Sequence, residues 1–184
     1  MKYIFVCGLP GSGKGVIRVL LDNSNDDLIT CPFQGFGYEI IDDKFDRYLN
    51  REKQIDVISR QKKMKSGFIY VGNKVLNIGE FFYLISNSLK DLINSSYGQY
   101  IRAASNQNDE QFVKFKFDYK SFINKISSAF ENKKKFTNKI KLYEFFIYCF
   151  VMEWKKKDIN KNNFFFLVSM NNGSKVIENI NSYF

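Results

Sequence analysis

A glycine-rich stretch near the N-terminus has the residue types and spacing of a phosphate-binding loop. Positions 8–15 read GLPGSGKG, so Gly8 stands four residues before the pair Gly13-Lys14. Glycines let the backbone curl until several N–H groups point at one anion, and a helix that follows adds the positive end of its dipole. Lys14 adds a full charge on a long stem. The residues predicted to bind a phosphate group are Gly8, Pro10, Gly11, Ser12, Gly13, Lys14 and Gly15.

The last position of this pattern normally carries a Ser or Thr that holds Mg²⁺. Gly15 and Val16 stand there instead, and neither has a hydroxyl group. The loop is therefore suited to an anion and poorly suited to a metal ion, and we expect no metal site. A glycine-rich turn that joins a strand to a helix and binds nothing is the alternative interpretation.

Short apolar runs predict the elements around this loop. Residues 3–7 predict a strand, and the apolar positions of 16–21 have helical spacing. Two further runs, 28–31 and 164–168, are typical of buried parallel strands. Because ligands of parallel sheets lie at the carboxyl ends of the strands, we expect the segment 32–37 to face the same crevice as the glycine-rich loop.

The middle of the chain is predicted to be largely helical. Amphipathic helices are expected over 78–93, 121–130 and 137–154, and a hairpin around Gly72-Asn73. The polar stretch 95–110 is expected to be a loop. The fold class is therefore predicted as α/β: a three-layer α/β/α arrangement of P-loop type with a central parallel sheet, in a single domain over residues 1–184.

The composition limits the classes of function. The chain has 184 residues, a net charge of +9 and no histidine, so the commonest general base is missing. The abundance of lysine, asparagine, isoleucine and phenylalanine is typical of an AT-rich genome, so the charge is weak evidence for a nucleic-acid partner. The alternating stretch 112–119, FVKFKFDY, fits either a platform for single-stranded nucleic acid or a half-buried strand, and we favour the strand. No nucleic-acid partner is expected.

The cysteines and the apolar runs bear on the compartment. Cys7, Cys31 and Cys149 are scattered and lie in apolar surroundings, which predicts buried free thiols. The longest apolar runs are too short to span a bilayer, and the glycines of the loop interrupt any signal-peptide pattern. We therefore expect a soluble cytoplasmic protein without a transmembrane segment.

The loop alone, GLPGSGKG, resembles that of adenylate kinase and related nucleoside monophosphate kinases. Those kinases place a glycine after the lysine and then a threonine, and Val16 stands at the threonine position here. The late strand, FFFLV, leads into Ser169 and has no terminal aspartate. This resemblance implies a Mg²⁺-dependent, ATP-binding enzyme.

The longer stretch from Ile4 to Gln34 resembles the start of a sulfotransferase. That family has an apolar strand, a loop of the type G-x-P-[RK]-S-G-T-T, a helix with a Leu-Leu-Asp end, and a second strand that leads into a Pro-Phe loop. The matching residues are Gly8, Pro10, Ser12, Gly13, Leu20, Leu21, Asp22, Pro32 and Phe33. Gly11 replaces the family's basic residue, and Lys14 and Gly15 replace its two threonines.

The sulfotransferase resemblance implies binding of 3′-phosphoadenosine 5′-phosphosulfate and transfer of its sulfuryl group to a hydroxyl or amine acceptor. Lys14 and Ser12 would stabilise the charge on the leaving phosphate. Glu39 and Asp42 are candidates for the base, although solvated surface carboxylates are the more ordinary interpretation of both. Phe184 lies before the segment that would carry the family's 3′-phosphate-binding arginine. The resemblance therefore implies a truncated member, an inactive relative or one piece of a split protein.

Three hypotheses follow: a sulfotransferase-like protein, a nucleotide kinase-like enzyme, and a non-catalytic remnant that binds an anion or a partner. The expected ligand is a nucleotide-type anionic donor, and the acceptor is unknown. If the sheet lacks the strand that the sulfotransferase family has after the position of Phe184, its edge would be open, and the chain could self-associate through it.

Overall fold

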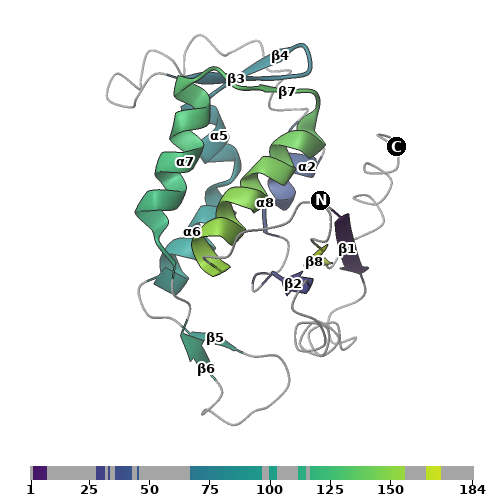
Figure 1. Ribbon diagram of the computed structural model, residues 1–184, viewed down its shortest axis with the longest axis vertical. Helices are drawn as coiled ribbons and strands as arrows, with labels where there is room; N and C mark the ends of the chain where they lie inside the picture. Colours follow the sequence, from purple (N-terminus) through teal and green to yellow (C-terminus); the bar gives the residue numbers. More distant parts are fainter. Residues whose placement is uncertain are drawn as a thin grey trace.

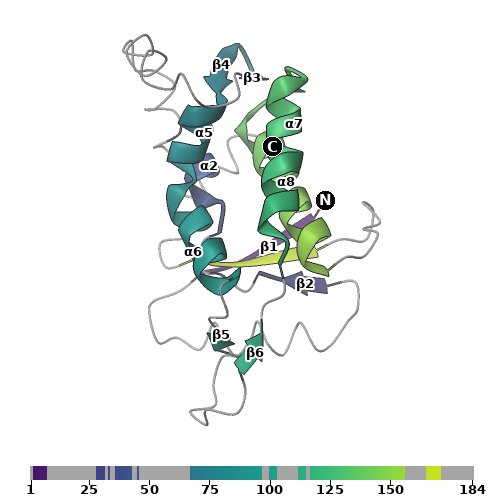
Figure 2. The ribbon, with the colours of Figure 1, turned by 90° about the vertical axis from the view of Figure 1, so that its left-hand side faces the viewer.

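The computed structural model describes residues 2–7, 28–31, 33, 36–42, 45, 67–96, 100–102, 112–114, 117–155 and 165–170 (Figure 1). Helices stand between a small sheet at one end and a parallel sheet beside their other end. In the turned view, α5 and α6 follow one another on one side, and α7 and α8 stand on the other (Figure 2).

The parallel sheet confirms the three strands that the apolar runs predict. It consists of β1 (Lys2–Cys7), β8 (Phe165–Met170) and β2 (Leu28–Thr30), in the order β1-β8-β2. Cys7 pairs with Met170, so β1 and β8 end at the same level, and Thr30 pairs with Leu167. The strand latest in the sequence therefore lies between the first two.

A second sheet has the order β4-β3-β7 and contains the predicted hairpin. It consists of β3 (Phe68–Val71), β4 (Lys74–Asn77) and β7 (Lys135–Phe136). Gly72 begins the two-residue turn with φ +60°, a conformation that glycine adopts without steric cost. The two residues of β7 carry no sequence pattern that predicts a strand. The strand forms because they pair in parallel with β3.

The prediction of one continuous helix over 78–93 is wrong. The structure has α5 (Ile78–Leu84) and α6 (Ser86–Ser96), with a break at Ile85. A capping box begins α5: Glu80 N donates to Asn77 Oδ1 at 2.8 Å, and Asn77 N donates to Glu80 Oε2 at 3.0 Å. The apolar spacing runs through the break because Ile85 itself is fully buried.

The other two predicted helices are confirmed as α7 (Tyr119–Glu131) and α8 (Lys139–Lys155), and a short α2 (Tyr38–Ile41) packs on α8. Asp118 caps α7 by accepting from Ser121 N at 2.9 Å. Between α7 and α8, the buried Glu153 forms a salt bridge with Lys125 and accepts a hydrogen bond from Ser121 Oγ.

Aromatic side chains from distant parts of the chain form the core. The ring of Phe36 lies 5.0 Å from that of Phe146 and 4.5 Å from that of Phe150, measured between centroids. Phe122 joins them from α7, with its ring 5.6 Å from that of Phe146. The segment after β2 is thereby packed against α8.

The stretch 95–110 is not a loop throughout, because β5 (Tyr100–Arg102) pairs antiparallel with β6 (Phe112–Lys114). The strand favoured within 112–119 is confirmed at its first three residues. The helix expected over 16–21 lies outside the described residues. The structure is thus mixed α/β with a three-stranded parallel sheet, and the three-layer arrangement stays a prediction.

Among the helices that the structure describes, none combines the length and apolar character needed to cross a membrane.

Candidate functional site

The glycine-rich loop and the segment that begins at residue 171 follow strands that end at the same level. Gly8 comes directly after β1, which ends at Cys7, and residue 171 comes directly after β8, which ends at Met170. Strand β2 ends beside Leu167 of β8, and it points in the same direction. In parallel sheets this edge is where ligands bind, so the sheet supplies the strand context that a phosphate-binding loop requires.

The residues predicted to hold the phosphate group lie outside the described part of the structure. This applies to the whole predicted set: Gly8, Pro10, Gly11, Ser12, Gly13, Lys14 and Gly15. The strand that precedes them is confirmed. Their roles stay predictions.

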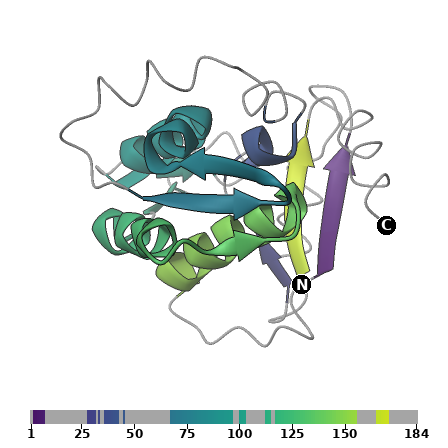
Figure 3. The ribbon, with the colours of Figure 1, turned by 90° about the horizontal axis from the view of Figure 1, so that it is seen from above.

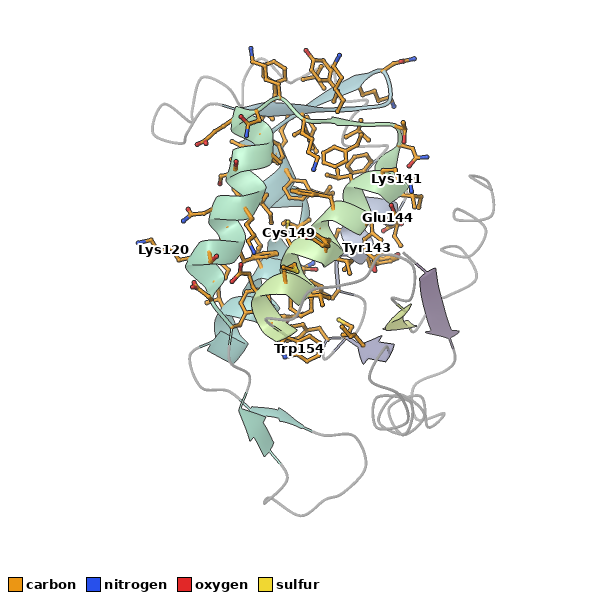
Figure 4. All side chains as sticks on the ribbon, in the orientation of Figure 1. Lys120, Lys141, Tyr143, Glu144, Cys149 and Trp154 are labelled. Carbon is orange, nitrogen blue, oxygen red and sulfur yellow. The ribbon has the colours of Figure 1, made fainter. Side chains whose placement is uncertain are left out.

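The segment after β2 differs from its predicted role as a ligand-facing loop. Phe33 and Phe36 are buried in the core, and Gly37 is buried with φ +72°. A Cβ atom at Gly37 would lie 2.8 Å from the Phe146 ring and 2.9 Å from the Tyr143 ring. Glycine is therefore required here for close packing against α8, where Tyr143 lies (Figure 4). The remaining residues of 32–37 lie outside the described part of the chain.

A hydrogen-bonded group connects this segment to the break between α5 and α6. Gly37 N donates to Ser88 Oγ at 2.9 Å, and Ser88 Oγ donates to Glu39 Oε2 at 2.8 Å. Ser88 N donates to Glu39 Oε1 at 3.2 Å. Since Ser88 stands in the first turn of α6, the Glu39 carboxylate also occupies the positive end of that helix. We call Gly37, Glu39 and Ser88 the Ser88 anchor.

The environment of Glu39 corrects the expectation of an ordinary solvated carboxylate. The side chain is half-buried, and burial raises its pKa above the ordinary value. Hydrogen bonds from its own backbone and from Ser88 act in the opposite direction, and nearby Asp91 adds to the rise. Both carboxylate oxygens accept from Ser88, so the geometry gives Glu39 an anchoring role. Asp42, the other candidate base, is half-buried.

The described cysteines confirm the prediction of buried free thiols. Cys31 and Cys149 are buried thiols that are not in a disulfide, and the side chain of Cys7 lies outside the described residues. Burial raises the pKa of the Cys149 thiol to about 12. Cys149 lies on the inner side of α8 (Figure 4), where an un-ionised thiol behaves as a small apolar group. Within the described ranges, no three His, Cys, Asp or Glu side chains gather as they would to hold a metal ion.

Sequence reasoning did not single out Ser88. The signal available was the run Ser86-Asn87-Ser88 inside a helical pattern, because such residues compete with helical hydrogen bonds and favour helix starts. Its partner, Glu39, is 49 positions away in the chain, which no local pattern indicates.

No family model, curated protein or solved structure matches this chain.

Proposed function

We propose that the glycine-rich loop after β1 binds the phosphate end of a nucleotide-type donor. The observation that supports this most directly is the parallel pairing of β1 with β8, because both strands end at the same level and β1 ends at Cys7, the residue before the glycine-rich loop in the sequence. A strand that ends in G-x-x-x-x-G-K at such an edge is the context in which this motif binds phosphate groups.

On the resemblance to sulfotransferases, the donor is 3′-phosphoadenosine 5′-phosphosulfate. The acceptor oxygen or nitrogen forms a bond to sulfur while the bond from sulfur to the 5′-phosphate oxygen breaks. The acceptor proton leaves to solvent or to a carboxylate, and 3′-phosphoadenosine 5′-phosphate is released. This transfer requires no metal, which agrees with Gly15 and Val16 at the position where a hydroxyl would hold Mg²⁺.

The protein's contribution would be electrostatic. Backbone N–H groups of the loop, the Ser12 hydroxyl and the Lys14 ammonium would face the charge that grows on the leaving phosphate. Such donors act most strongly when they are held in place before reaction. The Ser88 anchor fixes the segment that follows β2.

Calorimetric titration tests the donor class. The full chain is titrated with 3′-phosphoadenosine 5′-phosphate in the presence of a chelator, and separately with ATP and Mg²⁺. We expect the first ligand to bind and the chelator to have no effect. Metal-dependent binding of ATP in preference would contradict the sulfotransferase proposal and favour a kinase-like enzyme. Binding without transfer to a panel of hydroxyl and amine acceptors would favour a non-catalytic anion-binding protein.

A further inference from the structure

The outer face of the β4-β3-β7 sheet carries an ordered group of aromatic and basic side chains. Ile69 and Leu76 are fully buried and face the helices, so their alternate neighbours face outward. Pairing aligns Val75, Tyr70 and Lys135 across the three strands. Val75 is 43% exposed. We call the outward set Phe68, Tyr70, Val75, Lys133 and Lys135 the basic–aromatic face.

Two lysines of this face lie over its two rings. Lys133 Nζ is 5.3 Å from the centroid of the Phe68 ring, and Lys135 Nζ is 5.6 Å from that of the Tyr70 ring. The residues of this face include two lysines, Lys133 and Lys135, and neither Asp nor Glu. The face is therefore positively charged, and its chemistry complements an anionic partner.

Lys133 has a backbone conformation that supports a role for its side chain. Lys133 N donates to Phe130 O at 3.1 Å, and Lys134 N donates to Ala129 O at 2.9 Å, which is the Schellman arrangement at the end of α7. Lys133 has φ +50°, at the position that such helix ends usually give to glycine. A lysine there is strained relative to glycine, and an outlier of this kind points to function.

The sheet closes one end of the molecule. Figure 1 places β3, β4 and β7 beyond the ends of α5, α7 and α8, and in the view from above the strands of this sheet lie in front of the helices (Figure 3). Among the described elements, the outward face of this sheet is thus presented along the long axis. An anionic membrane surface is flat and carries the complementary negative charge.

We propose that the basic–aromatic face binds the surface of an anionic lipid bilayer. The lysine ammonium groups contact headgroup phosphates and carboxylates, and the rings and Val75 lie at the headgroup level. Single-stranded nucleic acid fits less well. The Phe68 and Tyr70 rings are close to perpendicular, at 83°, and each has an ammonium group over it, so they do not offer parallel faces to successive bases.

Vesicle sedimentation tests the proposal with the full chain. Binding is measured to vesicles of phosphatidylcholine alone and of phosphatidylcholine with phosphatidylserine, at low and high salt. We expect binding to the anionic vesicles only, weakened by salt. Lys133→Gly should reduce the partition coefficient about fivefold, and adding Lys135→Gln should reduce it about fivefold again.

The Lys133→Gly variant separates loss of binding from loss of folding. Because glycine suits φ +50°, this variant should be more stable in urea, with the folded-to-unfolded ratio raised roughly threefold while vesicle binding falls. The matched control is Lys120→Gln, which removes an exposed charge from the far part of α7 (Figure 4).

Three results would overturn the proposal. One is absence of binding to anionic vesicles. Another is an equal loss of binding in Lys120→Gln and in the variants of the basic–aromatic face, which would indicate attraction by net charge alone. The third is tighter binding of an unstructured oligonucleotide than of vesicles, lost on Tyr70→Ala, which would assign the face to nucleic acid.

Discussion

Ser88 and Glu39 are joined by two hydrogen bonds, from Ser88 N and from Ser88 Oγ, although 49 positions separate them in the chain. The same hydroxyl accepts from Gly37 N. One buried serine therefore joins the segment after β2 to the first turn of α6, which follows the break at Ile85.

Replacing Ser88 with alanine should destabilise the fold. The change leaves the buried Gly37 N–H without its acceptor and removes one of the donors to the Glu39 carboxylate. Such losses typically cost about 1–3 kcal/mol. Urea denaturation measures the free energy of unfolding. The control is Ser86→Ala, which changes an exposed serine two residues earlier in the same helix. Equal stability of the two variants would contradict the anchoring role.

Stability should depend on pH through Glu39. Its pKa in the folded state is raised above the ordinary value of 4.5, because burial disfavours the charged form. The unfolded chain therefore ionises first as the pH rises, and the folded state loses stability from about pH 4.5 upward until the folded group has also ionised. Below 4.5 this group contributes no pH dependence.

Glu39→Gln removes this titration and keeps an acceptor for Ser88 N. The difference in unfolding free energy between the native chain and the variant, measured by urea denaturation from pH 4 to pH 8, should shift in favour of the variant as the pH rises. Because Asp91 is electrostatically coupled to Glu39, both proteins carry Asp91→Asn in this comparison, which removes the titration of Asp91. A difference that is constant with pH would show that burial of Glu39 has no effect on its ionisation.

Alanine at Gly37 should be costly, because it introduces two penalties together. The residue has φ +72°, and the new Cβ would lie 2.8 Å from the Phe146 ring. Strain and overpacking together predict a loss of roughly 3 kcal/mol. Gly72→Ala separates the two effects, since Gly72 has φ +60° but its nearest neighbour would be Thr137 O at 3.5 Å. That variant should lose only about 1 kcal/mol, and thermal denaturation compares the two.

Several elements could be predicted because their signals are local. The apolar runs of β1, β2 and β8, the Gly72-Asn73 turn and the periodicity of α7 and α8 each lie within a short stretch of sequence. Strand order could not be predicted in this way. That β8 lies between β1 and β2 depends on pairing between residues more than a hundred positions apart.

The errors have a common physical cause, which is tertiary contact overriding a local pattern. The break at Ile85 keeps that side chain in the core, so the apolar spacing continues through it. The segment containing Phe36 and Gly37 has the composition of a loop, but the rings of α8 bury it. Strand β7 has two residues, and only its pairing with β3 makes it a strand. For the site, sequence indicates the glycine-rich loop, and the structure adds the parallel edge from which it starts.

We propose that the loop after β1 binds the phosphate end of a nucleotide-type donor through Lys14. The most direct test is calorimetric titration of 3′-phosphoadenosine 5′-phosphate into the native chain, into Lys14→Ala and into the surface control Lys120→Ala. We expect the native chain and the control to bind equally, and Lys14→Ala to bind at least tenfold more weakly while its urea midpoint is unchanged. Equal affinity of all three proteins would contradict the claim.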